Sequence, residues 1–212
     1  MEQRKISKAV LKRLPGYLAY LKSTNDNAPS HISATALANA LGMGEVQVRK
    51  DLAMVSDGGR PKIGYLRSSL IDDIEQFLGY DNTTDAILIG AGKLGQALMA
   101  YSGFQEYGLK ILAGFDAAPT VDAAEDGTPI YHISQLPGFC RAHKVLMAII
   151  TVPAAHAQQV CDLLIENGIK AVWNFAPTHL DVPANILVQN ENMATSFAVL
   201  SMHLQANIKD KK

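Results

Sequence analysis

Apolar positions along the second part of the chain form short continuous runs separated by amphipathic stretches. Each run is typical of a parallel strand that is buried on both faces. The runs occupy residues 86–89, 110–115, 144–152, 170–175 and 185–189. Between two of them, residues 154–168 have helical spacing and end at Gly168, which suits a left-handed helix cap. Alternating strands and helices predict an α/β domain with a doubly wound parallel sheet.

The region before residue 80 has the spacing of amphipathic helices. Residues 8–22 carry one apolar stripe, which consists of Val10, Leu14, Tyr17, Leu18 and Leu21. Pro15-Gly16 lies inside this stretch and predicts a kink or a late helix start.

Two shorter helices are predicted next. Ser33 is a suitable N-cap for the first, and Gly42-Met43-Gly44 forms the turn before the second. The second helix buries positions i, i+4 and i+7, which are Val48, Leu52 and Val55. Two helices joined by a short glycine-containing turn are typical of a helix-turn-helix.

The residues that follow predict a basic hairpin. Gly58-Gly59 marks its turn, and Ile63-Gly64-Tyr65 returns as a strand, like the wing of a winged-helix domain. Long polar side chains on the second helix and the wing suit base edges and phosphates. We expect contacts with double-stranded DNA from Ser33, Gln47, Arg49, Lys50, Arg60, Lys62 and Tyr65. The alternative is a three-helix domain whose basic loop contacts a protein.

Charge supports a nucleic-acid partner only modestly. Residues 1–80 hold 11 Lys+Arg against 8 Asp+Glu, a net charge of +3. Residues 81–212 hold 8 against 12, a net charge of −4. The sign of this asymmetry favours DNA as the partner of the N-terminal part.

A glycine pattern after the first apolar run indicates a nucleotide site. Gly90-Ala91-Gly92-Lys93-Leu94-Gly95 opens a helix, the context in which G-x-G-x-x-G is meaningful. Gly90 permits the turn, Gly92 lets the backbone approach a pyrophosphate, and Gly95 allows close helix packing. Asp116 ends the next strand, where a carboxylate accepts hydrogen bonds from a ribose and repels the 2′-phosphate of NADP. NAD(H) is therefore the expected cofactor.

Two later turns are expected beside the same cofactor, because ligands of doubly wound sheets lie at the carboxyl ends of the strands. They are Thr151-Val152-Pro153 and Asn174-Phe175-Ala176-Pro177. The alternative for both is ordinary turn chemistry after a strand.

Nothing in the sequence indicates catalysis. Residues 191–212 are too few for a substrate-binding lobe, and no Ser/His/Asp or metal-ligand cluster is visible. Five histidines are scattered beyond residue 130, at His132, His143, His156, His179 and His203, and of these His156 or His179 would lie nearest the site. We expect no catalytic residue and no metal. Two other functions stay open: an NAD-dependent oxidoreductase, and a CoA- or nucleotide-binding module with a protein-interaction head.

Composition predicts a cytoplasmic protein. The chain is 48% hydrophobic, enough for a core, but has no apolar run long enough to span a membrane. The N-terminal MEQRKISKAVLKRL lacks the apolar region of a secretion signal. Cys140 and Cys161 have no metal-ligand spacing and are expected to be buried thiols.

Taken in order, these motifs resemble one family, the Rex redox-sensing transcriptional repressors. The resemblance rests on KRLPGYLAYL, VRKDL at 48–52, the wing ending in GY at 64–65, GAGKLGQALMAY, TVP at 151–153 and GIKAVWNFAP at 168–177. It implies a homodimer whose subunits have a winged-helix domain at 1–80, a Rossmann domain at 81–190 and a domain-swapped helix at 191–212.

The resemblance also implies binding to pseudo-palindromic operator DNA, from which NADH releases the protein. Tyr101, Phe175 and the partner's Met193 are then expected near the nicotinamide. The apolar residues of the final segment form one stripe of an amphipathic helix, Met193, Phe197, Leu200, Leu204 and Ile208. The resemblance implies that this helix is exchanged, and the alternative is a helix packed on its own domain.

The chain departs from the family pattern in the wing, at Ser56 and at Arg60-Pro61-Lys62, and at two charged positions. Ala19 stands where many members have an arginine, and Asn192 stands where many have an aspartate. In the family these charged residues, with the tyrosine matched by Tyr101, connect the DNA-reading domain to the nicotinamide pocket. Their joint absence predicts a weaker redox response.

Overall fold

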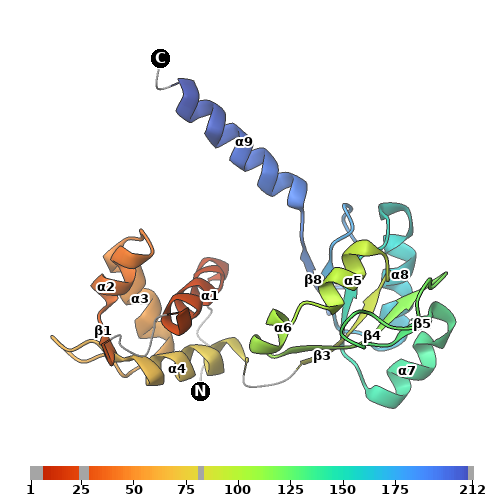
Figure 1. Cartoon of the computed structure of the whole chain (residues 1–212), viewed down its shortest axis with the longest axis horizontal. Helices are drawn as coiled ribbons and strands as arrows, with labels where there is room; N and C mark the ends of the chain where they lie inside the picture. Colours follow the sequence, from red (N-terminus) through yellow and green to blue (C-terminus); the bar gives the residue numbers. More distant parts are fainter. Residues whose placement is uncertain (1–6, 24–28, 81–83, 210–212) are drawn as a thin grey trace. The chain divides into compact units, whose positions relative to one another are not determined.

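The computed structural model describes residues 7–23, 29–80 and 84–209 of the chain. The molecule divides into two units, Met1–Asn82 and Thr83–Lys212. Figure 1 shows a mostly helical first unit with a small antiparallel sheet, and a second unit with a larger sheet and helices.

The first unit has the helical pattern expected from its sequence. Its elements are α1 (Lys8–Ser23), β1 (His31–Ile32), α2 (Ala34–Ala40), α3 (Glu45–Val55), β2 (Tyr65–Leu66) and α4 (Arg67–Leu78). Helix α1 runs through Pro15 without a late start. Pro15 removes the N–H partner of the Leu11 carbonyl, but Leu11 is exposed, so water can replace that partner.

The apolar stripe of α1 forms the centre of the first core. All five of its predicted residues are buried, together with Val48 and Leu52 of α3 and Leu70 and Ile74 of α4. Ser33 caps α2, since its hydroxyl oxygen accepts a hydrogen bond from the Ala36 N–H at 3.0 Å. The predicted helix-turn-helix is therefore present, with α3 as its second helix.

The wing turns at a different place from the one predicted. The antiparallel bridge joins Arg60 to Gly64, so the turn is Pro61–Ile63 and not Gly58-Gly59. Gly64 has φ +90°, and a Cβ there would overlap the Ile32 carbonyl oxygen of β1. This close approach lets β2 pair with β1 and ties the wing to the helices.

The second unit is a parallel doubly wound sheet. Its strands are β3 (Thr84–Ile89), β4 (Leu109–Asp116), β5 (Ile130–His132), β6 (Met147–Ile150), β7 (Ala171–Asn174) and β8 (Leu187–Asn190). Its helices are α5 (Lys93–Met99), α6 (Gly103–Glu106), α7 (Leu136–His143), α8 (Ala154–Glu166) and α9 (Met193–Lys209), with the short helix η1 (Ile133–Gln135). The strand order is β5-β4-β3-β6-β7-β8, so the direction of the winding reverses between β3 and β6.

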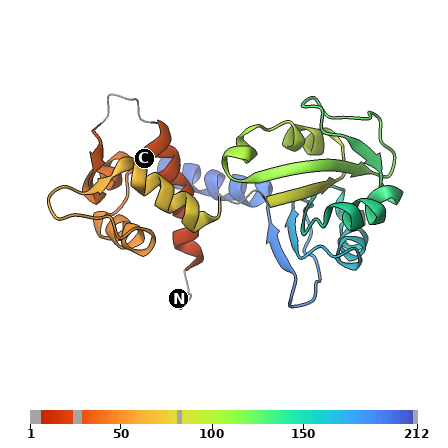
Figure 2. The same cartoon turned by 90° about the horizontal axis from the view of Figure 1, so that it is seen from below.

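Alternate residues of the strands pack into two cores. Ile87 and Ile89 of β3 face α7 and α8, whereas Leu88 faces α5. Figure 2 shows these helices on opposite sides of the sheet. Cys140 and Cys161 lie in the core between the sheet and helices α7 and α8. Burial raises the pKa of both thiols, as expected for inert cysteines.

Helix α9 follows β8 as one long helix (Figure 1). Phe197, Leu200 and Leu204 are 70%, 66% and 59% exposed, so the described part of its apolar stripe has no cover. The side chains of Met193 and Ile208 lie outside the described residues. No helix within the described ranges is long and apolar enough to cross a membrane.

Candidate functional site

The glycine loop after β3 lies where the winding of the sheet reverses. Gly90 has φ +103°, and a Cβ there would lie 2.9 Å from the Val152 backbone nitrogen. At Gly95 a Cβ would overlap the Gly90 carbonyl oxygen. At Gly92 no atom lies within 4 Å of the same position. Two glycines are therefore required by the packing of the protein itself, whereas Gly92 leaves its side of the loop open to a ligand.

Asp116 lies at the end of β4 beside this loop. Its carboxylate accepts hydrogen bonds from the Ala91 N–H at 2.8 Å and from the Ala118 N–H at 2.9 Å. Two backbone donors fix the carboxylate, and each of its oxygens keeps a lone pair for a further donor. A ribose with two hydroxyl groups supplies such donors.

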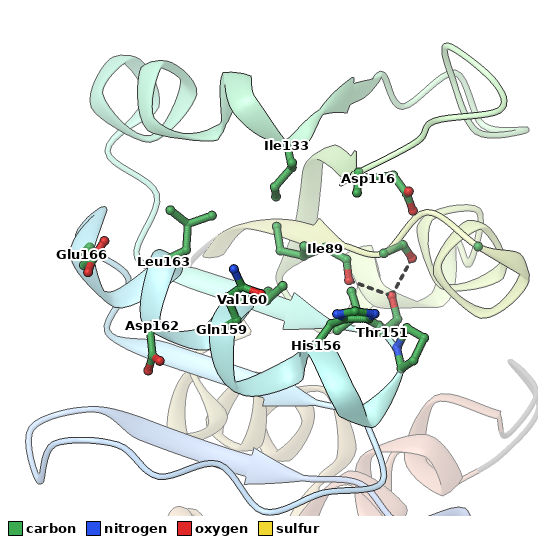
Figure 3. A pocket seen from close by; sticks show the side chains of 15 residues that line it. Ile89, Asp116, Ile133, Thr151, His156, Gln159, Val160, Asp162, Leu163 and Glu166 are labelled. Carbon is green, nitrogen blue, oxygen red and sulfur yellow. Dashed lines mark hydrogen bonds between the residues drawn. The ribbon is translucent and has the colours of Figure 1, made fainter.

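The turn after β6 completes this end of the site. The Thr151 hydroxyl donates to the Gly90 carbonyl oxygen at 2.7 Å, with the Ile89 carbonyl oxygen at 3.1 Å (Figure 3). These contacts connect the ends of β3 and β6, so that Val152 and Pro153 lie against the glycine loop.

A cavity of about 710 Å³ opens from these elements, a size suited to a small-molecule ligand. Figure 3 shows Asp116 and Thr151 at one end of it and Glu166 at the other. The predicted residues that line it are Gly90, Gly92, Asp116, Thr151, Val152 and Pro153. Ala91, Lys93, Leu94 and Gly95 belong to the loop and to α5 but do not line this cavity.

One wall of the cavity was not predicted, and α8 supplies most of it. Its lining residues are His156, Gln159, Val160, Asp162, Leu163 and Glu166. Ala157, Cys161 and Leu164 form the stripe of α8 that is buried against the sheet. Because this stripe faces the sheet, the lining residues on the neighbouring face of α8 point toward the cavity. Ile133 lies across from them (Figure 3). The helical period of α8 was visible in the sequence, but its packing decides which stripe meets the ligand space.

Asn174 was expected to contact the cofactor, but it does not line this cavity. Its side chain is fully buried, and its amide nitrogen donates to the Thr178 carbonyl and the Asn190 side-chain oxygen, each at 2.9 Å. Its amide oxygen accepts from the Ala176 N–H at 3.0 Å. These contacts engage both ends of the amide. The Asn174 side chain therefore braces the loop after β7, and a contact of this residue with the cofactor stays a prediction.

Tyr101 and Phe175 also lie outside the cavity. They belong to an aromatic cluster with Phe104 and Trp173, in which ring centroids are 4.9–5.6 Å apart. Tyr101 is 55% exposed at the edge of this cluster. Both rings are thus separate from the Asp116 end, and any role for them concerns a different part of a bound dinucleotide.

The residue types that bind metal ions are scattered over the described residues. Within them, no three His, Cys, Asp or Glu side chains are grouped so that they could hold a metal ion. His156 lines the cavity, whereas His179 does not.

Helix α3 exposes the residues expected to read DNA. Gln47, Arg49 and Lys50 are all exposed, and Arg49 forms an ion pair with Glu45 one turn earlier. Arg60 and Lys62 are exposed on the wing. Ser33 is exposed at the start of α2, where its hydroxyl already serves as the cap.

Tyr65 differs from the other residues expected to contact DNA, because its ring is buried. It is 9% exposed, packs in the first core and closely approaches the backbone of Gly59. Burial raises the pKa of its hydroxyl. Tyr65 therefore holds the wing against the helices, and its contact with DNA stays a prediction.

A buried polar network that the sequence did not reveal joins α1 to α3. Asp51 is 2% exposed, and its carboxylate accepts from Arg13 Nε at 2.7 Å, Arg13 Nη2 at 2.9 Å and the Tyr17 hydroxyl at 2.8 Å. The hydrogen bond to Asp51 raises the pKa of Arg13, and burial followed by that hydrogen bond raises the pKa of Tyr17 to about 12. Both partners thus keep their protons around Asp51 at neutral pH.

Comparison with known proteins gives matches along the chain. The family described as "Putative DNA-binding protein N-terminus" matches residues 5–53, and "CoA binding domain" matches residues 81–178. A protein of Porphyromonas gingivalis named "Redox-sensing transcriptional repressor Rex" is 39% identical over 197 residues, which cover 92% of this chain and 90% of that protein.

Two solved structures are similar over their full length. One is RSP in complex with β-NAD+ and operator DNA, at 31% identity and a TM-score of 0.89, covering 99% of this chain and 97% of that one. The other is RSP in complex with β-NADH, at 30% identity and a TM-score of 0.85, covering 99% and 100%.

Proposed function

The chain belongs to the Rex family of redox-sensing transcriptional repressors, and we propose that it binds operator DNA as a homodimer and NAD(H) in the cavity beside Asp116. The observation that carries the cofactor proposal is the open side of the loop at Gly92, next to a carboxylate held by two backbone donors. A pyrophosphate can approach the loop there while Asp116 accepts hydrogen bonds from the adenosine ribose. The RSP complexes with NAD+ and NADH support the same assignment.

The redox response follows from the charge of the nicotinamide ring, which is positive when oxidised and neutral when reduced. Tyr101 and Phe175, with the partner's Met193, would surround the ring with largely apolar groups. Such surroundings favour the neutral ring, because an unpaired buried cation is costly. NADH can release the protein from DNA only to the extent that it binds the DNA-free state of the protein more tightly than the DNA-bound state.

The proposal of a homodimer is supported by α9. Phe197, Leu200 and Leu204 form an exposed stripe on one helix, and a second subunit can cover it by exchanging this helix. Two DNA-reading helices held at a fixed separation then match the two halves of a palindromic site.

The redox response is expected to be weaker than that of family members with the charged pair. Asn192 accepts a hydrogen bond from the Thr195 N–H at 3.1 Å and thus caps α9 without a charge. Ala19 is exposed on α1.

The test uses the full chain and a duplex enriched from a random-sequence pool by binding to it. Fluorescence anisotropy with NADH and with NAD+ is expected to show weaker DNA binding with NADH, and sedimentation to show a dimer. The double variant A19R/N192D is expected to enlarge the NADH effect. A monomer that binds no duplex overturns the proposal, whereas a large NADH effect in the wild type contradicts only the weakened response.

CoA binding is a second candidate, because residues 81–178 match the CoA binding domain family. Thermal unfolding separates the two ligands, since a saturating ligand at about 100 times its Kd adds roughly 2.7 kcal/mol. We expect this gain from NADH and not from CoA.

We propose no catalytic role, and NADH oxidation in the presence of small ketones or aldehydes would contradict this.

A further inference from the structure

We propose that Arg13 is a positioning residue for base recognition, which holds the side-chain oxygen of Gln47 so that Gln47 presents its –NH2 group to DNA and selects guanine. This inference rests on the proposed DNA-binding function. It adds a determinant of sequence specificity that lies on α1, outside the helix that reads the DNA.

Gln47 and Asp51 occupy the same face of α3, because they are four residues apart. The donors around the Gln47 amide are satisfied when its oxygen faces Arg13, and in that orientation the oxygen accepts from Arg13 Nη2 at 2.9 Å and Arg13 Nη1 at 3.3 Å. One guanidinium therefore bridges the buried Asp51 and the exposed Gln47.

Arg13 is itself firmly held. Its Nε and Nη2 both donate to the Asp51 carboxylate, which is 2% exposed and also bonds the Tyr17 hydroxyl. A planar guanidinium fixed by two such bonds has little freedom to rotate. The orientation of the Gln47 amide thus depends on a core ion pair and not on the helix surface alone.

This orientation determines what Gln47 can recognise. A glutamine that reads adenine uses its oxygen to accept from N6 and its nitrogen to donate to N7. When the oxygen faces Arg13, the outward group is –NH2, which matches the O6 and N7 acceptors of guanine. Gln47 is the third residue of α3, and N-terminal residues of a recognition helix are those that contact base edges.

The experiment compares base preferences after selection from a random-sequence duplex pool. The position read by Gln47 is the one whose preference disappears in Gln47→Ala. In the wild type we expect guanine there. The double variant R13M/D51L replaces the ion pair by apolar side chains, so that neither charge is left unpaired and only the Tyr17 hydroxyl loses its acceptor. It is expected to lower the guanine preference at that position by about 5-fold or more, with other positions unchanged.

A matched control and a second variant make the result specific. The control K22M/E75L removes another ion pair of α1, between Lys22 Nζ and Glu75 Oε1 at 2.6 Å, and is expected to keep the wild-type preference. Gln47→Glu leaves the core untouched and replaces the donor by acceptors. It is expected to change the preference from guanine to cytosine, whose N4 amino group is a donor.

Adenine at the Gln47 position in the wild type overturns the inference. An unchanged guanine preference in folded R13M/D51L also overturns it, and circular dichroism establishes the folding. If R13M/D51L does not fold, Gln47→Glu decides: retained guanine preference overturns the inference, and a change to cytosine supports it. Failure of the wild type to enrich any sequence instead contradicts the proposed function.

Discussion

The two candidate sites of this protein are built from different material. The nucleotide cavity depends on backbone: glycines at Gly90 and Gly95, and N–H groups that fix Asp116. The DNA-reading face depends on a side-chain network in which Arg13 reaches Asp51, 38 residues away along the chain. A site made of backbone leaves a local glycine pattern in the sequence. A site oriented by a distant ion pair leaves none.

The largest expected effect concerns the side-chain network. Asp51→Ala removes the carboxylate that accepts from the Arg13 guanidinium and the buried Tyr17 hydroxyl, and is expected to lower the free energy of unfolding of the first unit by about 3–5 kcal/mol. Urea unfolding followed by circular dichroism measures this. Asp57→Ala, at an exposed position of the same unit, is the control and is expected to change little. A loss below about 1 kcal/mol in Asp51→Ala would mean that water replaces the carboxylate.

The glycine loop tests the other half of the comparison. A Cβ at Gly92 meets no protein atom, so Gly92→Ala is expected to change stability by less than about 0.5 kcal/mol. The added methyl group occupies the space through which a pyrophosphate approaches, and NADH affinity is expected to fall about 10- to 100-fold. Calorimetric titration and thermal unfolding give the two quantities separately.

Gly95→Ala is the matched control for that loop. Its Cβ would overlap the Gly90 carbonyl oxygen, so stability is expected to fall by about 1–3 kcal/mol. Similar losses of stability in both variants would show that Gly92 also serves packing, which contradicts its assignment to the ligand.

Asp116 tests nucleotide selectivity. Asp116→Asn keeps an acceptor for the Ala91 N–H but removes the negative charge, and hydrogen bonds to charged groups contribute about 1.5–3 kcal/mol. NADH affinity is expected to fall about tenfold or more, while NADPH gains relative to NADH. Titration with both nucleotides measures this, with Asp122→Asn as the control. An unchanged NADH-to-NADPH ratio would argue against ribose recognition by Asp116.

The smallest effect is a dependence of stability on alkaline pH. Because the pKa of Tyr17 rises from 10.0 to about 12 in the folded state, its contribution is fully present below pH 10 and is lost as pH rises toward 12. Tyr17→Phe is expected to be less stable at neutral pH but to lose less stability between pH 10 and 12. Urea unfolding at pH 8, 10 and 11 measures the difference, and parallel losses in both proteins would contradict it.

Much of the fold was predictable because it follows from local patterns. The apolar runs at 86–89 and 110–115 became β3 and β4, and the stripe of α1 became the first core. The strand expected at 185–189 begins later, at Leu187. Strand β5 was not predicted, since three residues carry too little periodicity to be recognised.

The site was predicted less completely. Glycine spacing and a carboxylate after the next strand identified the loop and Asp116, because both requirements are local. The burial of Asn174 and Tyr65 was not predicted, because a polar residue after a strand and a tyrosine in a wing look the same whether they face ligand or core. Their burial results from neighbours elsewhere in the chain.

By itself, the sequence determined the two kinds of domain and the glycine loop between β3 and α5, since helical period, strand period and turn geometry are properties of neighbouring residues. Only the tertiary structure decided which stripe of α8 lines the cavity, where the wing turns and which partner holds Asp51. Those contacts join residues far apart in the chain, and their free energies depend on burial that exists only after the helices and strands have packed.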